Sequence, residues 1–275
     1  MELSDSVLQH LRDVVDLPDL AGTRYELEGE IGRGGLGVVY AARDRQLERR
    51  VALKVMDAAW AGEARLIARL EHPGIVPVHD TGTLPDGRVF YAMKLVAGAR
   101  ADRYAEANPS LGERLRVVQR VGEALAYAHS CGVLHRDLKP QNVMVGAFGE
   151  VYVMDWGVEG VAGTPAFRAP EGGFDQRSDV YSLGALLKFM LPPDPPRALS
   201  AVAGKAMNAD PAARYGDAGA LLEDLRRFQE GLAVEAYAEP LAQRLRRFGK
   251  RNEVLLWLLA AYAAVRFFLF FLRRA

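Results

Sequence analysis

The first third of the chain has the hydrophobic and polar pattern of β-strands. From Tyr25 it reads YELEGEIGRGGLGVVYAARD and then RRVALKVM, which predicts a β-hairpin followed by a further strand. A helix-like stretch, EARLIARLEH, opens at Glu63 with its apolar residues spaced for one inner face. A long helical segment follows over 111–130, and NVMV and VYVMD then predict a pair of strands. Strands therefore dominate the first part of the chain, and the longest helix comes after them.

The C-terminal end is almost uniformly apolar. Residues 254–272 read VLLWLLAAYAAVRFFLFFL, a run that Arg266 alone interrupts. A helix rises about 1.5 Å per residue, so this run would extend nearly 30 Å, the thickness of a bilayer core. We therefore predict a C-terminal transmembrane helix over 254–272. A buried or interfacial amphipathic helix is the alternative.

The charges around this run predict its orientation. A basic juxtamembrane linker over 233–253 precedes it, and two arginines follow it. The positive-inside rule then places the upstream residues in the cytoplasm, so we expect a single-pass protein of the cell membrane. At the other end, residues 1–24 predict a helical extension that Ser4 or Asp5 caps and Pro18 ends. This helix either packs on the main domain or serves as a docking helix.

Composition narrows the classes of function. Lys plus Arg and Asp plus Glu each number 35, which argues against a basic nucleic-acid binder and against a strongly acidic tail protein. Half of the residues are apolar, enough for a sizeable core. The single cysteine, Cys131, excludes an internal disulfide and fits a reducing compartment. The acidic N-terminus MELSDSVLQH predicts no signal peptide.

A glycine-rich turn carries the first candidate chemistry. It fits the pattern G-x-G-x-x-G-x-V, in which backbone N–H groups can approach phosphates without a clash from Cβ atoms. The same glycines also fit a dinucleotide fold or a plain turn. Because a second β-rich segment follows, we favour a β-hairpin over the strand-to-helix turn of a dinucleotide site. The four matching residues are Gly32, Gly34, Gly37 and Val39.

Lys54 ends the next apolar strand, VALK, where its ammonium can be directed at phosphates under the glycine turn. A lysine in this place is otherwise simply solvated. Glu63 lies near the start of the predicted helix and can pair with Lys54. The alternative for Glu63 is a first-turn acid that the helix dipole favours.

The strongest signal is the run HRDLKPQN at 135–142. DWG at 155–157, GTPAFRAPE at 163–171 and SDVYSLGALL at 178–187 follow it in order. With these motifs the chain resembles the eukaryotic-like Ser/Thr protein kinases, and the residues within the motifs are most similar to those of the bacterial membrane-anchored type. The resemblance covers residues 25–232. It implies an α+β, bilobal fold with a small β-rich N-lobe and a helical C-lobe, in a shortened form.

The resemblance implies transfer of the γ-phosphate of ATP, with Mg²⁺, to Ser or Thr hydroxyls of protein substrates. Asp137 then accepts or orients the proton of the substrate hydroxyl, and Lys139 contacts the γ-phosphate. Lys54 would hold the α- and β-phosphates with Glu63 fixing it. Thr164 matches the loop threonine that bridges to the catalytic Asp and Lys.

The same alignment assigns the metal and adenine positions. Asn142 and Asp155 match the two magnesium-binding positions and offer hard oxygen ligands. Met93 matches the gatekeeper, and the backbones of Lys94 and Val96 match the hinge. The apolar residues expected around the adenine are Ile31, Val39 and Ala52 above it and Met144 below it.

Further matches concern the support of the site. Glu171 and Arg214 match the pair that ties the activation segment to the C-lobe, and Asp179 matches the Asp that braces the catalytic loop. The hydrophobic spine is expected from Ile67, Val78, His135 and Trp156.

Three segments are shorter than the resemblance leads us to expect. Lys54 and Glu63 lie only nine positions apart, and the αG region, which often docks protein substrates, is largely missing. Between DWG and GTP stand five residues without a hydroxyl, so Glu159 is the only acid that Arg136 would meet there. We therefore predict constitutive activity without loop phosphorylation.

These departures leave two functions open. The first is an active Ser/Thr protein kinase at the membrane, and the second is a catalytically idle scaffold that binds ATP there. The complete set of phosphate and metal residues favours the kinase, and the short loops favour the scaffold. A small-molecule phosphotransferase is a third possible function. The GTPAFRAPE segment and Arg214 argue against it. A homodimer is left open.

Overall fold

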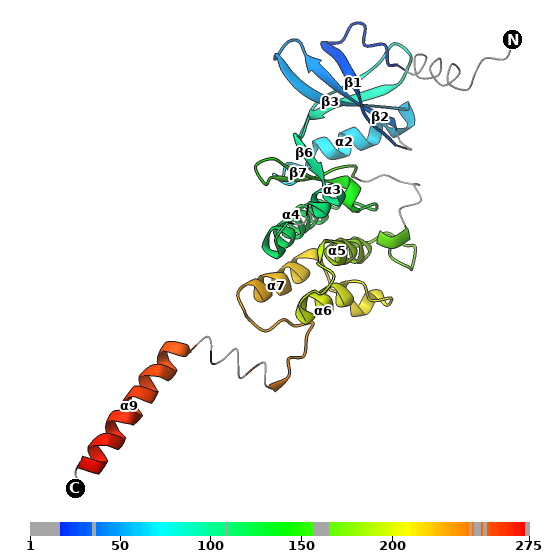
Figure 1. Ribbon diagram of the computed structural model, residues 1–275. Coiled ribbons are helices and arrows are strands. Elements are labelled where there is room, and N and C mark those ends of the chain that lie inside the picture. Colours follow the sequence, from blue (N-terminus) through cyan, green and yellow to red (C-terminus); the bar gives the residue numbers. More distant parts are fainter. Residues whose placement is uncertain are drawn as a thin grey trace, which may run out of the picture.

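The computed structural model describes residues 17–34, 37–107, 109–156, 165–241, 244, 249 and 252–272. An antiparallel sheet forms the N-lobe, and helices lie below it (Figure 1). Its strand order is β1-β2-β3-β5-β4. The strands are β1 (Tyr25–Gly34), β2 (Gly37–Asp44), β3 (Arg49–Met56), β4 (Val78–Thr83) and β5 (Val89–Lys94). The predicted hairpin is thus confirmed as the β1–β2 pair.

Alternate side chains of strand β3 point to opposite sides of the sheet, and those on both sides are buried. Leu53 and Val55 pack in a small cluster on one face with Phe90 of β5. Ala52 and Met56 belong to the main core on the other face. Helix α2 (Ala61–Ala68), preceded by the short helix η1 (Ala58–Trp60), covers that second face against β4 and β5.

The C-lobe is built around α4 (Leu111–Ser130), whose bounds agree with the predicted segment 111–130. Its start is fixed by a capping box, in which Ser110 Oγ accepts from the Glu113 N–H and the Glu113 carboxylate accepts from the Ser110 N–H. Helix α5 (Gln176–Met190) begins in the same way at Asp175 and Ser178. The other helices are α3 (Ala101–Glu106), α6 (Arg197–Ala206), α7 (Ala218–Gln229), η2 (Pro140–Asn142), η3 (Pro165–Phe167) and η4 (Pro211–Ala213).

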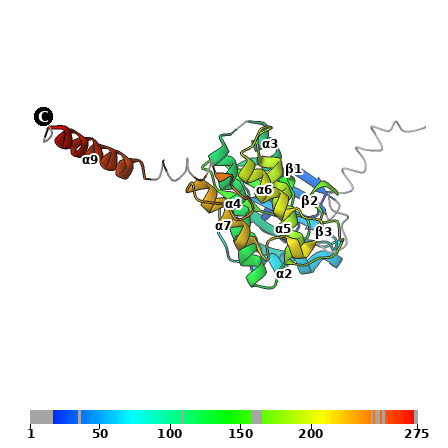
Figure 2. The same cartoon turned by 90° about the horizontal axis from the view of Figure 1, so that it is seen from below.

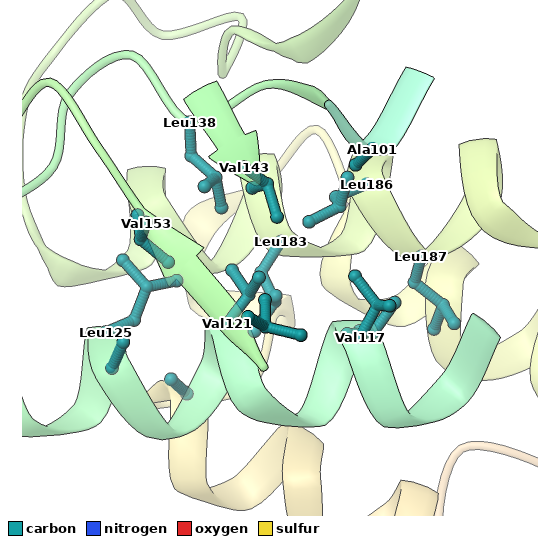
Figure 3. Close-up of a cluster of buried hydrophobic side chains, with 14 of the residues drawn as sticks. Ala101, Val117, Val121, Leu125, Leu138, Val143, Val153, Leu183, Leu186 and Leu187 are labelled. Carbon is teal, nitrogen blue, oxygen red and sulfur yellow. The ribbon is translucent and has the colours of Figure 1, made fainter. Parts of the chain in front are cut away.

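A small sheet of β6 (Gly98–Arg100), β7 (Val143–Gly146) and β8 (Val151–Val153) lies on α4. Figure 3 shows Val121 and Leu125 of α4 beside Leu183 of α5 and Val153 of β8. All four side chains are fully buried, and each such residue contributes about 1.5–3 kcal/mol by leaving water. This core fixes the two ends of the loop between α4 and β7, where the site residues lie. The predicted β-rich N-lobe and helical C-lobe are confirmed.

The folded domain continues beyond α7. The buried Asp224 carboxylate accepts from the N–H groups of Glu235 and Ala236 and from the Tyr215 hydroxyl. Val234 is buried as well. Residues up to at least Ala236 therefore pack on the C-lobe.

Helix α9 (Glu253–Leu272) lies away from both lobes in the two views (Figures 1 and 2). Trp257 and Tyr262 on it are mostly exposed. Among the residues that the structure describes, no helix has both the length and the apolar character needed to cross a membrane, so the predicted transmembrane helix over 254–272 is not found. Residues 1–16 of the predicted helical extension over 1–24 lie outside the described part, and residues 17–24 form no helix.

Candidate active site

The glycine-rich turn is the end of the β1–β2 hairpin. Gly32 lies opposite Val39, and Gly34 lies opposite Gly37. A Cβ atom on Gly37, which has φ +143°, would lie 2.2 Å from the Val55 carbonyl oxygen, so only glycine fits against β3 there. A Cβ atom on Gly32 or Gly34 would meet no atom within 4 Å. The hairpin therefore leaves the backbone of these two glycines open to an approaching group.

The residues expected around the adenine come from both lobes. Ala52 on β3 lies opposite Met93 on β5, and both are buried. Ile31 is about half exposed on β1, at 53%. The Lys94 N–H donates to the Pro77 carbonyl, 3.1 Å away. Val39 pairs with Lys54 across the sheet, Val96 follows β5, and Met144 lies on β7.

Lys54 and Asp155 join the two lobes. The Lys54 Nζ lies 2.8 Å from Asp155 Oδ1, and the lysine side chain is 5% exposed. Asp155 has the left-handed φ of +57°, which turns the chain after β8. Next to it Trp156 is fully buried and donates from Nε1 to the Val153 carbonyl. Glu63 lies within α2, but its side chain is outside the described structure.

The loop between α4 and β7 holds a second group of charges. Lys139 Nζ lies 2.6 Å from Asp137 Oδ2. Asn142 Nδ2 donates to the Asp137 carbonyl at 2.9 Å and lies 3.3 Å from Asp137 Oδ2. The Met154 N–H donates to the Asn142 carbonyl, 2.9 Å away, which places Asn142 beside the residue that precedes Asp155. Two of the predicted residues of HRDLKPQN, Lys139 and Asn142, thus both contact the third, Asp137.

Asp179, one per cent exposed on α5, braces this loop. Its Oδ2 accepts from the His135 N–H at 2.8 Å, and its Oδ1 accepts from the Arg136 N–H at 2.9 Å. His129 Nε2 lies 2.8 Å from the same carboxylate. Arg136 has the left-handed φ of +69°, a strained conformation for a non-glycine residue that these two hydrogen bonds support.

His135 is buried in the centre of the site. Burial holds the pKa of its imidazole below the ordinary value of 6.5, so the ring is neutral. Nδ1 accepts from the Asp137 N–H, and Nε2 lies 3.1 Å from the Met154 carbonyl, which identifies Nε2 as the protonated nitrogen. The ring packs on Trp156 with centroids 4.8 Å apart, as the predicted spine requires.

Glu171 and Arg214 form the expected ion pair. Arg214 Nη1 and Nη2 lie 2.7 and 2.6 Å from Glu171 Oε1 and Oε2, a bidentate arrangement. The arginine side chain is fully buried. Its hydrogen bond holds the pKa of the Glu171 carboxyl below its usual range.

Besides the Lys54–Asp155 pair, two contacts at the site were missed by the sequence analysis. The Lys94 ammonium lies over the Tyr152 ring and bonds its hydroxyl, and the Arg136 guanidinium lies by the Phe174 ring. Both pairs are far apart in sequence and no motif joins them. Thr164 and Glu159 lie in residues 157–164, outside the described part, so the contacts predicted for them stay predictions.

The chain offers few ligands of its own for a metal ion. No group of three or more His, Cys, Asp and Glu side chains that could hold a metal occurs among the described residues. Mg²⁺ is usually held by one or two carboxylates together with substrate phosphates, so no such group is needed for it. Asp155 and Asn142, the open glycine hairpin and the buried Lys54 fit Mg²⁺-bound phosphates.

Comparison with known proteins identifies the family. Residues 25–211 match the protein kinase domain family, which is more than half of the chain. The chain belongs to the protein kinase family. This confirms the predicted resemblance to the eukaryotic-like Ser/Thr kinases, because similar proteins include bacterial serine/threonine-protein kinases.

Three relatives illustrate the extent of the similarity. The kinase domain is 41% identical over 197 residues to the DNA damage-responsive serine/threonine-protein kinase RqkA of Deinococcus radiodurans, covering 61% of this chain and 29% of RqkA. It is 34% identical to PknL of Mycobacterium bovis, covering 80% of this chain and 69% of PknL. It is 37% identical to PknJ of Mycobacterium tuberculosis, covering 67% and 36%. The chain thus spans about a third of RqkA and of PknJ.

Proposed function

We propose that this chain is an active Ser/Thr protein kinase that transfers the γ-phosphate of ATP to hydroxyls of protein substrates. The arrangement of Asp137, Lys139 and Asn142 carries the proposal. The Asp137 carboxylate has the Lys139 ammonium 2.6 Å away and the Asn142 amide 3.3 Å away, on a loop that Asp179 braces. Phosphoryl transfer requires mainly positioning and electrostatic stabilisation, which this arrangement supplies.

Each residue has a distinct task in the proposed reaction. The Asp137 carboxylate orients the substrate hydroxyl and takes its proton, while Lys139 balances the charge that develops on the transferred group. Lys54 binds phosphate oxygens, and Asp155 and Asn142 would hold Mg²⁺. Bound Mg²⁺ neutralises phosphate charge. Lys54 is paired with Asp155, so the phosphate-binding ammonium and the metal-binding carboxylate lie side by side.

The neighbourhood of the adenine is proposed from the same match. Ala52 and Met93 form a buried apolar surface in the sheet, and Ile31, Val39 and Met144 would complete the enclosure. The backbones of Lys94 and Val96 would bond the adenine edge. Glu63 and Thr164 keep the roles that the resemblance implies for them, support of Lys54 and of the Asp137–Lys139 pair.

An ATP-binding scaffold without catalysis is the competing function. It would need Lys54 and the apolar surface of Ala52 and Met93, but it has no physical need for Lys139 and Asn142 in contact with Asp137. The distinguishing experiment incubates the full chain with Mg-ATP and a mixed protein substrate and locates new phosphates by mass spectrometry. We expect phosphoserine and phosphothreonine, absent with the Lys54→Met variant. ATP binding without any new phosphate would favour the scaffold.

We further propose that the C-terminal segment attaches the protein to the cell membrane, with the kinase domain on the cytoplasmic side. Trp257, Leu258 and Tyr262 on α9 are 70%, 63% and 63% exposed, and such apolar area is costly in water. Basic residues of the linker before α9 suit an anionic membrane surface. The full chain should sediment with membranes after alkaline extraction, and a chain truncated after Arg251 should not. Release of the full chain by carbonate would contradict this attachment.

A homodimer is the last part of the proposal. Confinement to a membrane raises the local concentration, so self-association would be favoured there. We expect the full chain in detergent to be larger by light scattering than one protomer, and the chain truncated after Arg251 to be monomeric. Equal, monomeric masses would exclude a dimer that depends on α9.

A further inference from the structure

Phe174 contacts two arginines that belong to different parts of the site. The Arg136 guanidinium carbon lies 5.6 Å from the centre of the Phe174 ring, and that of Arg168 lies 5.7 Å from it. Arg136 immediately precedes Asp137. Arg168 follows η3, in the segment that leads to Glu171. One aromatic ring therefore lies by a cation of the catalytic loop and by a cation of the activation segment.

Phe174 lies directly before the capped start of α5, so its backbone is held in place. Asp175, the next residue, caps α5 through the reciprocal hydrogen bonds with Ser178. Asp179, which follows Ser178, accepts a hydrogen bond from the backbone N–H of Arg136. The start of α5 thus holds Arg136 at both ends, by its backbone through Asp179 and by its guanidinium through Phe174.

An aromatic ring attracts a guanidinium without carrying a charge of its own. A phosphate on the activation segment would supply attraction only after modification, and residues 158–162 contain no Ser, Thr or Tyr to accept one. The Phe174 contact exists in the unmodified chain. It also places the guanidinium groups of Arg136 and Arg168 beside the same ring.

We propose that Phe174 is a positioning residue: its ring holds Arg136 and Arg168 and so keeps Asp137 in place for transfer without a loop phosphate. The proposal rests on the kinase activity proposed above. Phe174 acts through Arg136 and does not itself touch the substrate.

The test replaces Phe174 by Leu, which keeps apolar volume and removes the ring, and by Tyr, which keeps the ring. Phe189 provides a matched control. It is exposed to the same extent as Phe174, 42%, and contacts the ring of Phe167, while no cation of the described residues lies over its own ring. We expect Phe174→Leu to lower kcat about threefold to tenfold with the KM for ATP unchanged. Phe174→Tyr and Phe189→Leu should keep kcat close to that of the wild type.

A double-mutant cycle identifies the partner. If the ring acts through Arg136, Phe174→Leu should have no further effect on kcat in an Arg136→Met chain. Equal loss of kcat in the Phe174→Leu and Phe189→Leu chains, or an undiminished effect in the Arg136→Met background, would overturn the proposal. A change confined to the KM for the protein substrate would instead make Phe174 a docking contact and would overturn it too.

Hydrogen exchange tests the same contact without activity. Peptides that cover residues 134–139 should exchange faster in Phe174→Leu than in the wild type and in Phe189→Leu, because the catalytic loop is held less firmly. Unchanged exchange would reject the positioning role even in a chain that transfers no phosphate. An inactive wild type with the expected exchange pattern would reject the kinase activity alone.

Discussion

The Lys54 ammonium lies 2.8 Å from the Asp155 carboxylate, and this ion pair links the five-stranded sheet to the end of β8. Lys54 is buried, whereas Asp155 is about one third exposed. The lysine is therefore held in one orientation while the carboxylate keeps access to solvent. A nucleotide that brings phosphates and Mg²⁺ would find both charges already in place.

Lys54→Met should weaken the binding of Mg-ATP. One charge-assisted hydrogen bond is worth about 1.5–3 kcal/mol, so the affinity should fall by about ten- to a hundredfold. The measurement is the rise in melting temperature with increasing Mg-ATP, since a ligand selective for the folded state raises it. A binding curve that Lys54→Met leaves unchanged would contradict the phosphate-binding role.

Asp179→Asn should destabilise the protein and lower its activity together. The two oxygens of Asp179 each accept from a backbone N–H, of His135 and of Arg136. The asparagine amide has one oxygen and one NH₂ group, so one of these backbone donors would face another donor. We expect a loss of about 3 kcal/mol in the free energy of unfolding, measured by urea denaturation. The control is Asp175→Asn, which keeps an acceptor at the N-cap of α5. An equal loss of unfolding free energy in the control would show that the loss at Asp179 does not come from the bracing hydrogen bonds.

Arg214→Met should be far more costly than the same change at Arg226. Arg214 is fully buried and bidentate to Glu171, so its removal leaves a partly buried carboxylate without its cation, at about 3 kcal/mol. Arg226 pairs with Glu223 and Glu230 on the exposed surface of α7, where such pairs contribute about 0–1 kcal/mol. Urea denaturation of the two variants should separate these values, and similar losses would contradict the structural role of the buried pair.

The stability of the protein should fall as the pH drops below about 6.5. Burial lowers the pKa of His135, so the unfolded chain takes up a proton at a higher pH than the folded chain does. Folding stability from this group is complete above the unfolded pKa and is lost as the pH falls through the folded pKa. His135→Gln should make the slope of the unfolding free energy just below about pH 6.5 shallower, by up to about 1.4 kcal/mol per pH unit.

His72 and His79 also have pKa values lowered by burial, so part of the slope should remain in that variant. His72→Gln serves as the comparison because it lies outside the catalytic loop. Parallel slopes in the wild type and in His135→Gln would show that His135 binds a proton in the folded state.

Local pattern predicted those parts of the fold that depend on neighbouring residues. The apolar spacing of 111–130 predicts α4, and the glycines between two strand-like runs predict the β1–β2 hairpin. The Glu171–Arg214 pair followed from the family resemblance and not from spacing, because the two partners lie 43 positions apart. The Lys54–Asp155 pair, across 101 positions, was not predicted, since Lys54 was expected to pair with Glu63.

Contacts between distant positions that belong to no motif could not be predicted in this way. Phe174 carries no charge and belongs to no motif, so its place beside Arg136 emerges only when α5 and the catalytic loop are packed together. Lys94 and Tyr152 meet for the same reason, across 58 positions. The length and hydropathy of residues 254–272 predicted a transmembrane helix, which the described part of the structure does not bear out.

The most direct test of the proposed activity compares the full chain with its Asp137→Asn variant in transfer of radiolabelled γ-phosphate from Mg-ATP to a protein substrate. Asn keeps the size of Asp137 and its contact with Asn142 but has no carboxylate to take a proton. We predict transfer by the wild type and a rate lower by about 100- to 10,000-fold in the variant, with the melting shift by Mg-ATP retained. Equal rates in the two chains, or no transfer by the wild type, would contradict the assignment of this chain as an active kinase.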